Sequence, residues 1–402
     1  MKRKFIVFGL LTASSLYTFG QQKVDSLYAK KKISKTDIQL VYSHYIQDGN
    51  HSAITGGTGT EKLIVYSPDI TFKKQVDSIN GYSINAGVDV ISSASLDNID
   101  FIVSSASKLS NHGYINISYN RGIKNKGLTV SPSAYFSIES DYLSTGFGLS
   151  ANHISKEKTR ELSAAFEAFF DDLRWGRLNG ERPLRLVYPY ELRYKEWYNE
   201  YRRRSYNLSL GLQQTLNKRM LLGIFPGISY QHGLLATPYH RVYFKDSSLR
   251  VENLPRDRFK IPVGIQLNTF IGDRYVLRTY YRFYWDNFGI IAHSFEVELP
   301  VKITPAITLS PLFRFYTQTG SSYFKPYKEH SNDENFYSSD YDLSAFQSYE
   351  SGLETKFVVA GKNGGSVFNK FSLRYSYYKR TDGLYAHIIT LLIDASYQRE
   401  RH

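Results

Sequence analysis

The clearest feature of the chain is a regular alternation of apolar and polar residues between Phe259 and Val301. Three runs alternate in this way, and the links between them, residues 271–274 and 288–289, are very short. Because successive side chains of a β-strand point to opposite faces, each run predicts a strand with one apolar and one polar face. Each run is also about as long as a tilted strand that crosses a bilayer.

The same alternation recurs along most of the chain and predicts an all-β fold, an antiparallel transmembrane β-barrel over residues 36–397. The pattern gives about sixteen strands, or fourteen if two of the weaker segments are not strands. Long connections are expected after the first, third, seventh, ninth and thirteenth strands, and short ones after most even-numbered strands. This asymmetry is typical of long extracellular loops and short periplasmic turns.

The N-terminal residues predict an exported protein. Lys2, Arg3 and Lys4 precede a short apolar run, and small residues follow at Thr18 and Gly20, so residues 1–20 are expected to be a cleaved signal peptide. Residues 21–35 are expected to form a short periplasmic segment, and residues 398–402 a polar C-terminal tail. Export together with the strand pattern predicts the outer membrane of a Gram-negative bacterium.

The composition supports this class. The chain has 402 residues, with 34 Tyr and 25 Phe, and aromatic residues gather where a barrel meets the membrane–water interface. It has no Cys, which excludes disulfides, thiolate metal sites and a lipoprotein anchor. The net charge is +13, or +10 without the leader, but the basic residues are scattered, so nucleic acid is not an expected partner. Lipid, lipopolysaccharide and the outer-membrane assembly machinery are expected partners.

The polar faces of the predicted strands carry charges of both signs, which are expected to line the lumen. The basic candidates are Lys260, Arg278, Arg282, Arg314 and Arg374, and the acidic candidates are Asp89, Glu139, Glu296 and Glu298. An open lumen lined in this way would select ions or sugars. In a plugged lumen the same charges would pair across the barrel, because an unpaired buried charge is costly. The sequence leaves both alternatives open.

The predicted extracellular loops hold the remaining polar candidates. His44, Asp48 and His51 combine imidazole and carboxylate groups where the first strand enters its loop, and these are ligands for a divalent cation. A loop rim held by hydrogen bonds is the alternative. His240, Arg241, Trp175 and Trp197 are further loop-rim candidates. Glu329, Asp333, Glu334, Asp340 and Asp342 lie in a third loop without any known calcium-binding spacing. No cofactor is predicted.

Several short segments distributed over the chain carry a resemblance. They are residues 42–45, 87–95, 174–177, 237–244 and 339–344. Through these segments the chain resembles an uncharacterised family of predicted Gram-negative outer-membrane proteins, known only as a domain of unknown function. The resemblance implies a β-barrel and no particular activity or catalytic residue.

The function expected from the sequence is a pore or transporter for small solutes, with a preference for anions. The alternative is a non-conducting barrel that docks a periplasmic or surface protein. A membrane-embedded hydrolase is a third class, but the sequence contains no known catalytic motif, and the adjacent pair His293 and Ser294 must point to opposite faces of its strand. The chain is therefore not predicted to be an enzyme.

Overall fold

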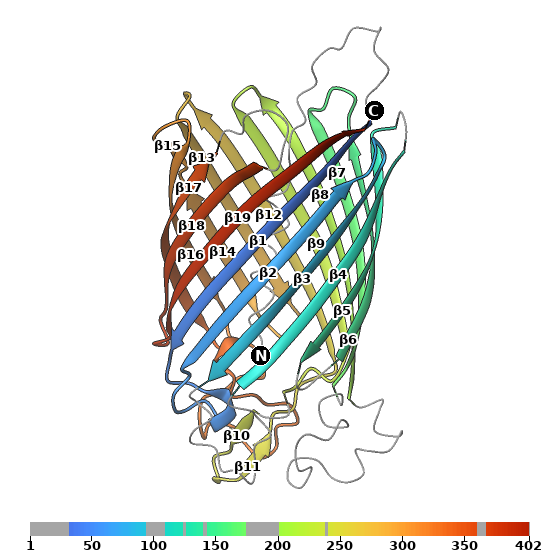
Figure 1. The fold of residues 1–402 in the computed structure, drawn as a ribbon. Helices are drawn as coiled ribbons and strands as arrows, with labels where there is room; N and C mark the ends of the chain where they lie inside the picture. The colour runs from blue at the N-terminus through green and yellow to red at the C-terminus, as the bar shows by residue number, and fades with distance from the viewer. Residues whose placement is uncertain are drawn as a thin grey trace.

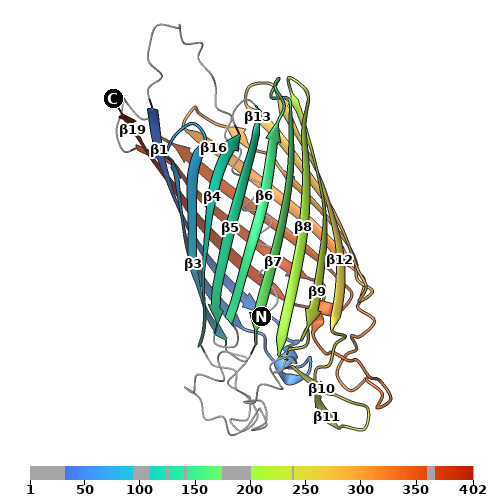
Figure 2. The ribbon, with the colours of Figure 1, turned by 90° about the vertical axis from the view of Figure 1, so that its right-hand side faces the viewer.

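A computed structural model of the protein describes residues 32–93, 109–123, 126–139, 143–173, 201–237, 240–359 and 367–401. The predicted signal peptide lies outside these residues. The described residues form a closed antiparallel β-barrel, seen from two sides in Figures 1 and 2. No helix among them is long and apolar enough to cross a membrane.

The barrel is built from strands that follow one another in sequence. Its first half contains β1 (Lys32–Asp48), β2 (Leu63–Gln75), β3 (Asn80–Ser93), β4 (Leu109–Ile123), β5 (Leu128–Glu139), β6 (Leu143–Ile154), β7 (Arg160–Asp172), β8 (Arg202–Asn217) and β9 (Met220–Gly233). Its second half contains β12 (Asp257–Ile271), β13 (Tyr275–Asp286), β14 (Ile291–Glu298), β15 (Val301–Lys302), β16 (Ile307–Gln318), β17 (Phe346–Val358), β18 (Val367–Arg380) and β19 (Tyr385–Arg401).

Two of these strands share one position in the wall. Both β14 and β15 pair with β13 on one side and β16 on the other. The break between them contains Pro300, which has no N–H to donate to the sheet. We call each strand position in the wall a stave, and count β14 and β15 as one. The barrel formed by the described residues then has sixteen staves, which confirms the predicted number.

The barrel closes between the first and the last strand. β1 pairs with β19 along its whole length, from Lys32 opposite Arg401 to Asp48 opposite Tyr385. Both strands extend four residues beyond the predicted boundaries, from 36 to 32 and from 397 to 401, and these extensions pair with each other. Backbone hydrogen bonding does not require apolar side chains, so the ladder continues past the end of the apolar alternation.

The outward face of the wall is apolar, as the alternation predicts. Ile38 and Leu40 of β1, Leu149 of β6 and Leu353 of β17 each expose between 38% and 53% of their surface. Similar residues recur around the described wall, and soluble proteins rarely expose so much contiguous apolar surface. A hydrocarbon environment removes this cost, so the described strands form a transmembrane β-barrel.

The two ends of the barrel differ. The end that contains the C-terminal end of β19 has short turns such as residues 218–219 and 272–274. The opposite end has the long connections 49–62, 234–256 and 319–345, as expected after the first, ninth and thirteenth staves. A small separate sheet, β10 (Arg241–Tyr243) with β11 (Leu249–Val251), lies beyond this end in both views. By the usual asymmetry of such barrels, the long-loop end is extracellular.

Candidate functional site: the loop cap and the charged lumen

Three long connections fold together at the extracellular end, and we call residues 49–62, 234–256 and 319–345 the cap. Asn253 and Tyr337 exchange two backbone hydrogen bonds of 3.1 and 2.7 Å, and the Lys245 N–H donates to the His330 carbonyl at 3.0 Å. Phe244 and His330 are fully buried between the two larger loops, with their ring centroids 5.7 Å apart. The cap therefore has a small core of its own.

The first loop joins the cap through ring stacking. His51 stacks on Tyr341, with centroids 3.8 Å apart and planes 13° from parallel. Tyr341 begins the short helix η5 (Tyr341–Leu343) of the third loop. Burial raises the pKa of the Tyr341 hydroxyl, and the nearby charges of Glu329 and Asp382 raise it further. The phenol therefore stays neutral and serves as a packing surface for the imidazole.

An apolar cluster joins the cap to the inside of the barrel. Leu254 and Leu343 from the cap pack with Phe288, Ile290 and Ala292, which lie at the turn and at the start of β14. The wall residues Tyr284 and Tyr316 also pack against this cluster. Two loops of the cap are thus anchored to one side of the barrel mouth.

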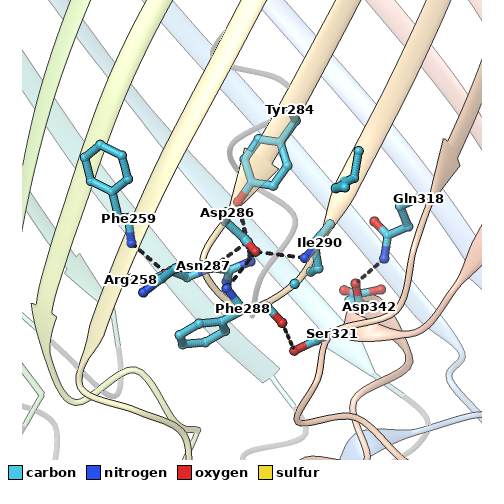
Figure 3. Close-up of polar contacts among 12 residues, drawn as sticks. Arg258, Phe259, Tyr284, Asp286, Asn287, Phe288, Ile290, Gln318, Ser321 and Asp342 are labelled. Atoms are coloured by element: carbon cyan, nitrogen blue, oxygen red, sulfur yellow. Dashed lines mark hydrogen bonds and ion pairs between the residues drawn. The ribbon is translucent and has the colours of Figure 1, made fainter.

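Asp286 organises this anchor, as Figure 3 shows. Its fully buried carboxylate accepts hydrogen bonds from the Tyr284 hydroxyl at 2.7 Å and from the Phe288 and Ile290 N–H groups at 3.0 Å each. Arg258 of the neighbouring strand donates to it through Nε at 2.9 Å and forms an ion pair with it. One carboxylate therefore holds the turn between β13 and β14 and ties it to β12.

The third loop is fastened to the same turn and to β18. The Ser321 hydroxyl and the Ser322 N–H both donate to the Phe288 carbonyl, at 3.0 and 2.8 Å. Arg380, only 3% exposed at the end of β18, donates to Asp342 at 2.6 Å and lies 3.8 Å above the Phe346 ring. Buried charge-assisted contacts of this kind hold a loop in one position over the mouth.

Three of the five predicted basic lumen residues, Arg278, Arg314 and Arg374, pair with acids on neighbouring strands. The ion pairs are Arg278 with Glu298 at 3.3 Å, Arg314 with Glu350 at 2.5 Å, and Arg374 with Glu354 at 2.7 Å. In each pair the two residues are direct partners in the sheet register. The charges thus pair along the wall, whereas the plugged alternative required pairing across the barrel. Lateral pairing satisfies the charges without filling the lumen.

The remaining lumen candidates occupy distinct positions. Glu296 lies opposite Arg314 in the register, and Lys260 lies opposite Asp286. Arg282, on the same inward face of β13 as Arg278, makes no carboxylate ion pair with any described residue. On the other side of the barrel, Asp89 contacts the His112 imidazole at 3.1 Å, and Glu139 is 4% exposed at the extracellular end of β5.

The proposed cation ligands His44, Asp48 and His51 have separate neighbours in the structure. His44 lies against the Tyr66 ring, 4.8 Å between centroids. Asp48 forms an ion pair with Lys62 at 3.7 Å. His51 is engaged with Tyr341, and its Nδ1 lies 3.1 Å from the Gly57 carbonyl oxygen. These contacts fit the alternative reading of a hydrogen-bonded loop rim.

The loop-rim candidates divide into two groups. Trp175 and Trp197 lie outside the described residues. His240 and Arg241 lie at the start of the β10–β11 hairpin, where burial lowers the pKa of the Arg241 guanidinium. His240 is within reach of Glu252 and Asp340, and the three side chains form a compact buried group. The sequence singled out His240 and Asp340 separately. Glu252 was missed because only the hairpin register places it opposite His240.

The fold and its apolar outer face define the class of protein: it is a transmembrane β-barrel of the bacterial outer-membrane type. A family model described as "Protein of unknown function (DUF3570)" matches residues 8–388, and the chain belongs to this family. This confirms the resemblance found in the sequence. A search of curated proteins finds no match.

Several solved structures are similar to this chain. One is OccK1 (OpdK) of Pseudomonas aeruginosa, with 8% identity and a TM-score of 0.42. Another is a BenF-like porin from Pseudomonas fluorescens Pf-5, with 11% identity and a TM-score of 0.40. A third is OpdQ of Pseudomonas aeruginosa, with 9% identity and a TM-score of 0.42. Each comparison covers 91% of this chain and 99% of the other chain. A function for this chain therefore rests on its own residues.

Proposed function

We propose that the protein is a channel for small solutes in the outer membrane of a Gram-negative bacterium. The observation that carries this proposal is the closed barrel of sixteen staves. Barrels of about eight strands are just wide enough for wall side chains to fill, whereas those of about sixteen strands leave an aqueous passage. Lateral pairing of the lumen charges supports the same conclusion, because it keeps the inward side chains close to the wall.

The channel is proposed to prefer anions. Arg282 and Lys356 both face the lumen, and neither makes a carboxylate ion pair with a described residue. Lys356 is the register partner of Ser372, on the side of the barrel that contains Lys370 and Arg374. Basic side chains that keep their positive charge in the lumen attract anions from solution and repel dissolved cations. The cap over the extracellular mouth would restrict which solutes enter.

A second candidate function is a docking platform for another protein. The outer surface of the cap exposes four large apolar side chains beyond the membrane-spanning strands: Leu249, Val251, Tyr327 and Phe336, each between 38% and 45% exposed. Apolar groups gathered at the water-exposed end of a membrane protein favour contact with a partner. In this function the barrel would be a rigid support for the cap. Lipopolysaccharide and the assembly machinery are its expected partners in either case.

Single-channel recording in a planar bilayer under a salt gradient tests the proposal. We expect steady conductance and a reversal potential that favours anions. Arg282→Gln is expected to lower the anion-to-cation permeability ratio about two- to fivefold, since one nearby charge in water contributes about 1 kcal/mol. The matched control is Lys218→Gln, in an exposed turn at the end of the barrel opposite the cap. It should leave the permeability ratio as in wild type. A silent bilayer with a correctly folded barrel would contradict the channel and favour the docking platform.

A further inference from the structure

Three buried side chains in the cap converge on one point. The His240 Nδ1 atom lies 3.5 Å from the nearer Glu252 oxygen and 3.8 Å from the nearer Asp340 oxygen. One ligand atom from each residue lies within 4.8 Å of the other two. All three residues are buried, at 8%, 4% and 6% exposure. Among the described residues this is the only group of three such side chains that meets this geometry.

The imidazole has an unsatisfied atom that points into the group. The buried His240 Nδ1 makes no hydrogen bond, although it is close to two carboxylates. A buried polar atom without a partner costs free energy, so such an atom in a native structure needs an explanation, and a bound ion is one. The lone pair of a neutral imidazole is a good ligand for a transition-metal ion.

The distances between the three groups agree with metal coordination. A zinc ion binds His nitrogen and carboxylate oxygen at about 2.0–2.2 Å, so two ligands of a tetrahedral site are about 3.4 Å apart. The separations of 3.5 and 3.8 Å around His240 Nδ1 are close to this value. A small closing movement of side chains would complete the site. A divalent ion would also balance the two carboxylate charges and leave the imidazole neutral.

The carboxylates are already oriented by neighbouring groups. The Thr237 N–H donates to one Glu252 oxygen at 2.6 Å, and the Ser338 hydroxyl donates to the other at 2.5 Å. The Asp342 N–H donates to the second Asp340 oxygen at 3.0 Å. Hydrogen bonds from outside the ligand set fix the direction of ligating carboxylates in metal sites.

The three residues come from two separate loops of the cap. Glu252 donates its N–H to the His240 carbonyl at 3.0 Å, so these two residues continue the β10–β11 hairpin. Asp340 belongs to the third loop and immediately precedes η5. We propose that His240, Glu252 and Asp340 bind one divalent transition-metal ion such as Zn²⁺, which joins the hairpin to the third loop and holds the cap together.

Metal binding by the purified, folded full-length chain tests the proposal. After chelator treatment, zinc sulfate is titrated in by calorimetry, and bound zinc is counted by elemental analysis. We expect one zinc ion per wild-type chain. Zinc is also expected to slow tryptic cleavage after the exposed cap residues Lys245 and Lys328. Magnesium should not give this protection, because imidazole is a poor ligand for that ion.

Variants separate this site from other zinc binding. His240→Gln is expected to weaken zinc binding at least about 100-fold and to abolish the protection. His232→Gln removes an exposed imidazole that also contacts a carboxylate, Asp257, and should bind zinc as wild type does. If the cap of His240→Gln is cleaved rapidly even without zinc, Asp340→Asn tests the metal site instead. Its amide oxygen can still accept the hydrogen bond from the Asp342 N–H, so the loop should keep its fold. A wild-type chain that binds no zinc would overturn the proposal. Equal zinc affinity of the wild type, His240→Gln and Asp340→Asn would overturn it as well.

Discussion

At the scale of single residues, Asp286 combines several separate contacts. It accepts two backbone hydrogen bonds within a tight turn, accepts from a wall tyrosine, and balances the Arg258 guanidinium. If the carboxylate were removed, the two N–H groups would lose this acceptor and Arg258 would lose its ion pair. A buried charge that loses its partner is among the most costly single changes in a protein.

Asp286→Ala is therefore expected to lower the free energy of unfolding by about 3–5 kcal/mol, because it leaves the Arg258 charge unpaired. Guanidinium-induced unfolding in detergent micelles measures this difference. The control is Asp273→Ala, in the exposed turn at the other end of β13, which should change the unfolding free energy by less than about 0.5 kcal/mol. Equal effects of the two substitutions would show that Asp286 has no special role.

A second residue-scale prediction concerns acid. Burial acts to raise the pKa of the Glu334 carboxyl, but hydrogen bonds from Lys325, the Ser331 N–H and His330 outweigh burial and lower it to about 2, from 4.5. Because the pKa is lower in the folded state, these contacts stabilise the cap fully above pH 4.5. Their contribution is lost as the pH falls from 4.5 towards 2.

Amide hydrogen exchange over residues 324–338 measures this loss. Wild-type protection should decline between pH 4.5 and pH 2, whereas Glu334→Gln should show reduced protection at neutral pH and little further decline. Asp333→Asn, the adjacent exposed carboxylate, should keep the wild-type profile. The role assigned to Glu334 would be wrong if its variant declined with pH as wild type does.

At the scale of elements, the β10–β11 hairpin is the part of the cap that lies beyond the end of the barrel. Its two strands have only three residues each, and they pair with each other rather than with the wall. Alternation over three residues is too short to predict a strand, so the sequence predicts only a long connection after the ninth strand. The membrane strands were predicted correctly because alternation extends over many residues and both faces have a fixed environment.

Replacing residues 241–251 with a short Gly-Ser linker tests the role of the hairpin as a mouth cover. The barrel ladder is untouched by this change, so the heat-dependent gel migration of a folded barrel should persist. Single-channel conductance should rise about twofold, because the narrowest part of a pore sets its resistance. The same linker in place of residues 303–306, a turn at the opposite end, serves as the control. Unchanged conductance would place the narrowest point elsewhere in the lumen.

At the scale of the whole molecule, the sequence predicted the barrel and its sixteen staves, and it named Arg278, Arg314 and Arg374 as lumen candidates. It did not predict how those charges pair, because the partners Glu350 and Glu354 were not singled out and the register was unknown. It also did not predict the meeting of His240, Glu252 and Asp340. That meeting depends on packing between loops far apart in sequence, for which no local periodicity exists.

The seam between β1 and β19 has a consequence for biogenesis. β1 gains its second neighbour only when β19 has been synthesised and exported. Every nascent intermediate therefore has two open edges, which are prone to aggregate and cannot remain exposed to lipid. A premature stop codon just before Tyr385 would remove only β19, but it would leave the ring open, because β1 and β18 would both lose their neighbour. Closure of the ring therefore waits until β19 has reached the membrane.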